Sequence, residues 1–84
     1  MKSKTTPEFW QRFDALPTVV QELARKNFKL WLANSRHPSL RFRLHADGKW
    51  SARVGSHYRA VAHFDGETFV GTWTGSHEDY NKLR

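Results

Sequence analysis

The stretch WSARVGSHYRA, residues 50–60, decides the fold because apolar and polar side chains alternate on both sides of a short turn. Successive side chains of a strand point to opposite faces of a sheet. A hairpin with a three-residue turn at 55–57 therefore places both aromatic side chains of the stretch on one face and Arg53 and Arg59 on the other. We call these the apolar face and the arginine face.

The alternation continues downstream of this hairpin. The Asp65-Gly66 pair is typical of a two-residue hairpin turn. In that register, Phe69 and Trp73 extend the apolar face, while Thr72 and Thr74 fall on the arginine face. The sequence thus predicts a third antiparallel strand.

Upstream, the length of the loop decides which side chains of a fourth strand are buried. A loop at 47–49 places Phe42 on the apolar face, whereas a two-residue Asp47-Gly48 turn turns Arg43 and His45 toward that face. Because burial sets strand register, we favour the longer loop. The prediction is a four-stranded antiparallel meander.

This register lines up Arg43, Arg53, Arg59 and Thr72 in one row across the sheet. Like charges directly opposite each other destabilise a sheet by about 0.2–1 kcal/mol per pair, so three arginines in line need an explanation. A bound polyanion supplies one. The alternatives are arginine side chains that extend into water or pair with acidic residues. Most acidic residues fall in predicted turns and helices, which favours the binding site.

Two helices are expected before the sheet. Residues 1–5 form a polar lead-in that we expect to be loose, and a first helix starts at a threonine cap before Pro7 and ends at Leu16-Pro17. A second helix, from Thr18 to near Asn34, carries an apolar stripe at helical spacing that would cover the apolar face. The expected class is α+β, with two N-terminal helices packed on the four-stranded meander. Residues 77–84 form a short C-terminal tail or helical turn.

The composition of the chain indicates which classes of partner it binds. The chain of 84 residues carries 14 Lys and Arg against 8 Asp and Glu, a net charge of +6, and has no cysteine. We expect one domain over residues 1–84, in the reducing cytoplasm, with no membrane segment. Nucleic acid or an acidic protein is the expected partner, although a positive charge that serves solubility alone remains an alternative. The histidines lack compact ligand spacing, so no metal and no cofactor are expected.

The residues on the arginine face suit RNA cleavage without a metal. Such cleavage needs a base for the 2′-hydroxyl proton, a cation for the phosphorane and an acid for the leaving oxygen. Arg59 would hold the scissile phosphate with Arg53 as a second clamp. His77 would exchange protons near neutral pH, and Tyr80 would donate a proton or stack on a base. The candidate RNA-binding residues around them are Arg41, Arg43, His45 and Lys49.

The segments WSARVGSHYRAV (50–61) and TGSHEDYNKL (74–83) together resemble the RelE/ParE superfamily of bacterial type II toxins. The resemblance extends from FWQRFDALP at 9–17 through RHPSLRF at 36–42. It implies a small toxin held inactive by a cognate antitoxin, with a toxin–antitoxin complex that binds operator DNA. RelE-like members cleave mRNA in the ribosomal A site and so inhibit translation.

The resemblance also assigns residues. Arg53 and Arg59 match the two strand arginines that contact the scissile phosphate, His77 matches the late catalytic histidine, and Tyr80 matches the late tyrosine. The chain departs from the family pattern in two ways. Many members open with a strand, which the polar lead-in here does not suggest. The best-known ribosome-dependent nucleases carry a cluster of lysines, whereas this chain has only Lys49 near the first hairpin. We therefore expect one open sheet edge, and an antitoxin segment that pairs with that edge or covers the arginine face.

The first interpretation is an mRNA endoribonuclease acting on the ribosome, centred on Arg59 and His77. Two alternatives remain: a ParE-like inhibitor of DNA gyrase with the same fold, and a non-catalytic nucleic-acid-binding module. The nucleic-acid-binding module fits less well, because Trp50 and Tyr58 fall on the buried face, whereas proteins that bind single strands by stacking display their aromatic side chains on the surface.

Overall fold

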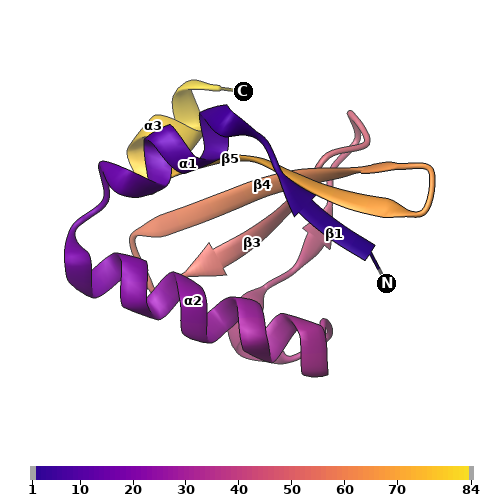
Figure 1. Cartoon of the computed structure of the whole chain (residues 1–84), viewed down its shortest axis with the longest axis horizontal. Coiled ribbons are helices and arrows are strands. Elements are labelled where there is room, and N and C mark those ends of the chain that lie inside the picture. Colours follow the sequence, from indigo (N-terminus) through magenta and orange to yellow (C-terminus); the bar gives the residue numbers. More distant parts are fainter. Residues whose placement is uncertain (1, 84) are drawn as a thin grey trace.

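The computed structural model describes residues 2–83 and has an α+β fold, as predicted (Figure 1). The elements follow in the order β1 (Lys2–Thr5), α1 (Pro7–Asp14), α2 (Thr18–Ala33), the short 3₁₀ helix η1 (Pro38–Leu40), β2 (Arg43–Leu44), β3 (Trp50–Val54), β4 (Tyr58–Asp65), β5 (Thr68–Ser76) and α3 (His77–Lys82). The strands form one five-stranded sheet in the order β1-β5-β4-β3-β2. β1 is parallel to β5, and the remaining neighbours are antiparallel.

The N-terminal segment is a strand, so the prediction of a loose lead-in over residues 1–5 was wrong for 2–5; Met1 lies outside the described residues. β1 pairs with β5 from Lys2 opposite Thr68 to Thr5 opposite Gly71. All four β1 residues are exposed, which explains why no apolar alternation marked the strand in the sequence. β1 occupies part of the β5 edge that we expected to be open.

The two N-terminal helices begin and end close to the predicted positions. Thr6 caps α1, because its hydroxyl accepts a hydrogen bond of 3.2 Å from the backbone N–H of Phe9. The side-chain amide of Gln21 donates to backbone carbonyls at the end of α1, which fixes the corner between α1 and α2. α2 ends at Ala33, as the predicted stop near Asn34 required.

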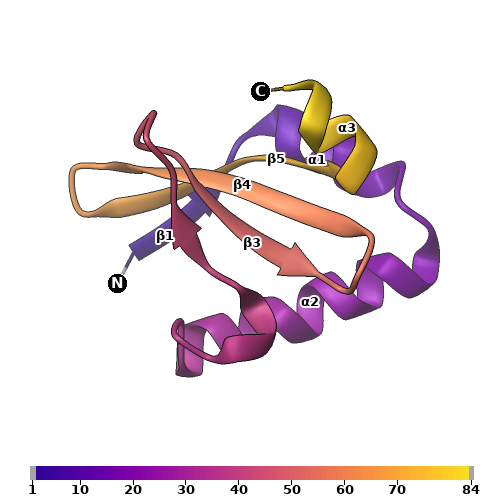
Figure 2. The same ribbon diagram turned by 180° about the vertical axis from the view of Figure 1, so that it is seen from behind.

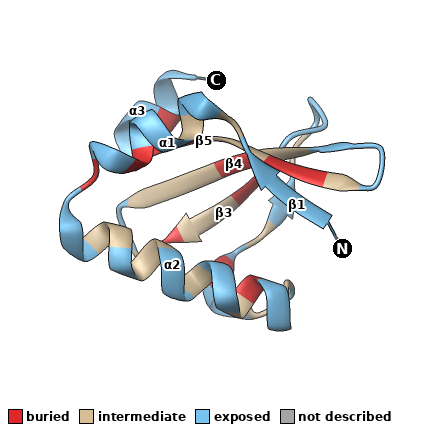
Figure 3. Cartoon of the chain, in the orientation of Figure 1, coloured by how far each residue is buried: buried red, intermediate tan, exposed pale blue. Residues whose placement is uncertain are grey.

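α2 packs against the apolar face of the sheet, and Figure 1 shows it running below the strands, beside the end of β3. The core on this side is built from Trp31 of α2, Leu40 of η1 and Phe69 of β5. Phe42 and Trp50 stack beside them with ring centroids 4.5 Å apart, which confirms that both lie on the apolar face. The buried residues gather where helices and strands meet (Figure 3).

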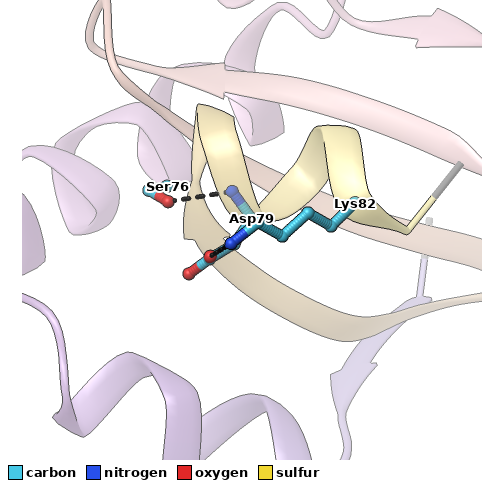
Figure 4. Close-up of polar contacts among 3 residues, drawn as sticks. All are labelled: Ser76, Asp79 and Lys82. Carbon is cyan, nitrogen blue, oxygen red and sulfur yellow. Dashed lines mark hydrogen bonds and ion pairs between the residues drawn. The ribbon is translucent and has the colours of Figure 1, made fainter.

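α3 lies on the opposite side of the sheet from α2, in front of the strands in Figure 2. Ser76 caps this short helix by accepting a hydrogen bond of 3.1 Å from the backbone N–H of Asp79 (Figure 4). The Asp79 carboxylate also forms an ion pair of 3.9 Å with Lys82 in the last turn (Figure 4). Residues 77–82 are thus helical, which is one of the two alternatives predicted for the C-terminal segment.

The hairpin of β3 and β4 has the predicted register, with Val54 opposite Tyr58 and Arg53 opposite Arg59. The β2 register was wrong by two residues, because Arg43 lies opposite Ser51 instead of Arg53. The loop before β3 closes one residue earlier than expected, with the His45 N–H donating to the Lys49 carbonyl at 2.8 Å. A shift of two residues leaves every side chain on its predicted face.

The register of β5 was also wrong, and here the error changes faces. Asp65 pairs with Thr68, so the turn is Gly66-Glu67 instead of Asp65-Gly66. A bulge then leaves Thr72 with no β4 residue directly opposite it and places Trp73 opposite Val61 on the arginine face. The buried Trp73 ring packs against Val61 beneath α3, and the bulge makes that packing possible.

Candidate functional site

Arg53 and Arg59 lie directly opposite each other on β3 and β4, as predicted, with Cα atoms about 5 Å apart in such a pair. The row that contains them differs from the prediction at both ends. Gly75 of β5, instead of Thr72, lies opposite Arg59, and Arg43 lies one row away beside Ser51. The predicted stripe of three arginines is therefore a pair, with Arg43 nearby on the same face.

Among residues 2–83, no carboxylate forms an ion pair with either arginine. Within residues 2–83, the only ion pair joins Asp79 to Lys82, both on α3. Burial and the nearby Arg53 lower the pKa of Arg59; the Tyr80 phenol opposes this shift, and Arg41 adds to it. The two guanidinium groups thus hold positive charge at a partly buried position, and this arrangement favours the binding of an anion between them.

The two arginines differ in how much of their donor capacity is used. The Arg59 Nη1 donates to the Tyr58 carbonyl at 2.9 Å, which holds that side chain against its own strand. The Arg53 Nε is buried and has no hydrogen-bond partner within the described residues. A buried donor without a partner is costly, so an acceptor supplied by a ligand would stabilise this arrangement.

Side chains from the apolar face fix the backbone that carries both arginines. The Asn27 amide of α2 donates to the Arg53 carbonyl at 3.2 Å, and the Thr74 hydroxyl donates to the Arg59 carbonyl at 3.0 Å. Thr74 was predicted on the arginine face, but the bulge turns it to the opposite face, where it is buried. Through these bonds, α2 and β5 hold the arginine-bearing strands in place.

A cluster of polar side chains lies next to the arginine pair. The Tyr80 hydroxyl is 3.0 Å from His45 Nε2, and the same nitrogen is 2.7 Å from the Ser51 hydroxyl. The Tyr80 ring packs against Trp73 and Val61, so the phenol is held between an apolar floor and an imidazole. We call Ser51, His45 and Tyr80 the hydroxyl–imidazole cluster.

The remaining predicted site residues are spread more widely. His77 is the exposed first residue of α3, and its backbone N–H donates to the His57 carbonyl at 2.7 Å. Arg41 has a left-handed backbone, with φ of 44°, and acts electrostatically on Arg59. Arg43 and Lys49 are exposed near the β2–β3 loop. The structure therefore joins Arg53, Arg59 and Tyr80 at one place and leaves His77 at the rim.

Sequence reasoning missed two residues of the site and gave a third a different role. Ser51 is only 5% exposed and supports His45, and Gly75 leaves the surface beside Arg59 without a side chain. A Cβ at Gly75 would lie 2.8 Å from the Trp73 ring, so the glycine also makes room for the indole. A small polar residue between Trp50 and Ala52 was the one available signal for Ser51. His45, which we predict to bind RNA, also contacts Tyr80.

Within the described range, no three histidine or acidic side chains come together as a candidate metal site. None of the helices in that range has the length and apolar character that a bilayer-spanning helix needs.

The sequence profile of the ParE-like toxin domain matches residues 19–82, which include α2 after its first residue, β2 to β5 and α3. The chain belongs to the ParE-like toxin family. This membership confirms the predicted RelE/ParE superfamily. No curated protein sequence matches the chain.

Solved toxin structures share the fold of this toxin domain. A YoeB/ParE toxin from Agrobacterium tumefaciens has a TM-score of 0.71 at 18% identity, covering 92% of this chain and 99% of that one. RelB–RelE from Methanococcus jannaschii has a TM-score of 0.75 at 13% identity, covering 94% and 95%. The isolated Escherichia coli RelE toxin has a TM-score of 0.65 at 17% identity, covering 98% and 93%.

Proposed function

We propose that this ParE-like toxin domain is a metal-independent endoribonuclease that cleaves mRNA on the ribosome. The observation that carries the proposal is the directly opposed pair Arg53 and Arg59, without a carboxylate partner within residues 2–83 and beside the Tyr80 phenol. Structural likeness to RelE and YoeB toxins supports the fold that such an enzyme needs. The net charge of +6 favours a polyanionic substrate.

The arginine pair supplies the electrostatic part of the reaction. Attack by the 2′-oxygen turns the scissile phosphate into a phosphorane with added negative charge. Arg59 and Arg53 would bind its non-bridging oxygens, and the unpartnered Arg53 Nε would gain an acceptor. Because the strands and their backing hydrogen bonds fix both guanidinium groups in advance, little reorganisation is needed during the reaction.

Proton transfer is assigned to Tyr80 and His77. The Tyr80 hydroxyl lies next to the arginine pair and would exchange a proton with the 2′-hydroxyl. His77, exposed at the start of α3, would protonate the leaving 5′-oxygen. Arg41, Arg43 and Lys49 would contact phosphates on either side.

A primer-extension assay tests the proposal. Purified chain is added to an mRNA with and without translating ribosomes, and the same reactions are run with Arg59→Ala and His77→Ala. We expect cleavage with ribosomes that falls about 100-fold in Arg59→Ala, the loss typical for one transition-state donor. Arg36→Ala removes the same charge from an exposed loop and should cleave like the parent chain. Intact mRNA in every reaction would refute the nuclease.

Inhibition of DNA gyrase is the second candidate function, because the matching profile is that of ParE-like toxins. A gyrase supercoiling assay distinguishes the two. If the chain stops supercoiling at concentrations that leave mRNA intact, the second function replaces the first. If supercoiling continues while mRNA is cut, the second function is excluded.

We further propose a cognate antitoxin as partner, because several structures with this fold are toxin–antitoxin complexes. Its binding segment is expected to cover the arginine face or pair with an outer strand, of which β1 is the longer at four residues and β2 has two. Hydrogen exchange on the complex tests this: equal exchange at both places, free and bound, would contradict it. Binding of operator DNA by the complex and the cytoplasmic location stay predictions.

A further inference from the structure

One imidazole nitrogen connects three elements on the arginine face. His45 Nε2, just after β2, is 2.7 Å from the Ser51 hydroxyl of β3 and 3.0 Å from the Tyr80 hydroxyl of α3. The Tyr80 contact spans 35 positions of sequence, so it depends on the folding of α3 back onto the sheet. Ser51 and Tyr80 are 5% and 9% exposed, whereas His45 is partly exposed, so water reaches the hydroxyl–imidazole cluster mainly at the imidazole.

This geometry has a chemical meaning for Tyr80. A phenol is a weak base until it gives up its own proton, and an imidazole is the side chain best suited to take a proton near neutral pH. His45 Nε2 is at hydrogen-bonding distance for that transfer. The Arg59 guanidinium interacts electrostatically with the Tyr80 phenol.

We infer that His45 is a positioning residue that holds the Tyr80 phenol and takes its proton during RNA cleavage. The inference rests on the proposed nuclease function and adds a residue to it. The Tyr80 hydroxyl gives its proton to His45 Nε2 and takes the proton of the substrate 2′-hydroxyl. The 2′-oxygen forms its bond to phosphorus, the bond from phosphorus to the 5′-oxygen breaks, and the leaving 5′-oxygen takes a proton from His77 or water. Two protons move at the 2′-side and one at the 5′-side, so charge and atoms balance.

Ser51 completes the arrangement from the other side. Its hydroxyl lies within hydrogen-bond distance of the same nitrogen and so fixes the position of the imidazole ring beside Tyr80; because Nε2 has a single lone pair, it accepts a hydrogen bond from one of the two hydroxyls at a time. The charged side chains of the neighbouring strands on this face are Arg43, Arg53 and Arg59, and α3, which packs on the same face, carries Glu78, Asp79 and Lys82.

The test compares His45→Gln, Tyr80→Phe and the double variant in single-turnover cleavage from about pH 5 to 9. Glutamine keeps a polar group near Tyr80 but cannot take a proton. We expect His45→Gln to lower the rate about 100-fold, the usual range for a lost proton acceptor. The parent rate should rise between about pH 5 and 8 as the imidazole becomes neutral, and His45→Gln should lose that rise. The double variant should be no slower than Tyr80→Phe, because His45 acts through Tyr80.

His57→Gln is the matched control, since His57 is an exposed histidine in the β3–β4 turn whose backbone carbonyl accepts a hydrogen bond from the His77 N–H. Thermal melting of each variant identifies lost fold, and RNA binding measured at pH 7 separates a loss of affinity from a loss of rate. A parent-like rate and pH profile in His45→Gln would overturn the inference while leaving the nuclease intact. Additive losses in the double variant would overturn it as well. A parent chain that cleaves no RNA would refute the proposed function, and the inference with it.

Discussion

The apolar face of the sheet lies beneath α2, a helix of 16 residues, whereas the arginine face lies beneath α3, a helix of six. Between the sheet and α2, aromatic and aliphatic side chains around Trp31 and Leu40 form the core, and a cavity of about 470 Å³ remains beside them. On the other side, the polar bonds of His45 supplement a small apolar contact. The comparison teaches that the long helix supplies buried area, while the short helix positions functional groups.

The largest stability effect is expected on the apolar face. Leu40→Ala removes a side chain that is 1% exposed and packs against Trp31 and Phe69, and a buried Leu→Ala change costs about 2–5 kcal/mol. Leu44→Ala is the matched control, because Leu44 is 57% exposed and should cost less than about 0.5 kcal/mol. Urea denaturation of both variants measures the difference. Equal losses would show that η1 does not anchor the core.

Arg59→Gln should separate function from stability on the other face. The pKa of Arg59 is lowered by burial and by Arg53, so the charged form is less favourable in the folded chain than in the unfolded one. This penalty is present at every pH below the folded pKa and disappears as the pH rises through that pKa. Arginine side chains keep their charge in the neutral range. A neutral glutamine removes the penalty at pH 7. We expect RNA cleavage to fall about 100-fold while the free energy of unfolding stays constant or rises by up to about 1 kcal/mol.

The measurements for this prediction are single-turnover cleavage and a denaturation curve at pH 7. Arg36→Gln, in the exposed loop after α2, carries the same change and should alter neither. If Arg59→Gln destabilises the chain by more than about 1 kcal/mol, the arginine pair contributes to structure and the separation of the two faces fails.

A turn that contacts α2 gives a smaller effect. Gly55 has φ of +66°, and a Cβ there would lie 2.8 Å from Leu23 Cδ2 of α2, whereas Gly66 has φ of +61° and nothing within 4 Å of an added Cβ. Both Gly→Ala changes incur about 1–2 kcal/mol for the left-handed backbone. Displacing the end of the Leu23 side chain should add about 0.5–1.5 kcal/mol to Gly55→Ala alone. Identical melting temperatures for the two variants would show that the Leu23 side chain of α2 moves aside at no cost.

Local alternation made the centre of the sheet predictable, and distant pairing made its edges unpredictable. The Arg53–Arg59 pair follows from one short turn between two alternating strands. β1 is entirely exposed and pairs in parallel with a strand more than 60 residues later, so it has no local signal. The bulge at Thr72 turns Trp73 to the other face, and strict alternation cannot represent an extra residue.

The same distinction applies to the candidate site. The arginines could be predicted because the strands that carry them are neighbours in sequence. The contact of Tyr80 with His45 could not, because it requires the β2 register, the path of β5 and the return of α3 to be known together. Tyr80 was therefore selected from its position three residues after His77 and from the resemblance, without its contact to His45, which was assigned to RNA binding.

The smallest effect tests how loosely the apolar face is filled. Ala60 lies in the middle of β4, opposite Ala52, and both line the cavity beneath α2 together with Gly71. If the cavity has room, Ala60→Val should raise the free energy of unfolding by about 0.5–1 kcal/mol, because each added carbon buried there contributes up to about 0.8 kcal/mol. Ala46→Val, in the exposed loop before β3, should give no gain. A loss of 1 kcal/mol or more in Ala60→Val, the size expected for overpacking, would mean that both faces of the sheet are equally tightly packed, and that the difference between them is one of chemistry alone.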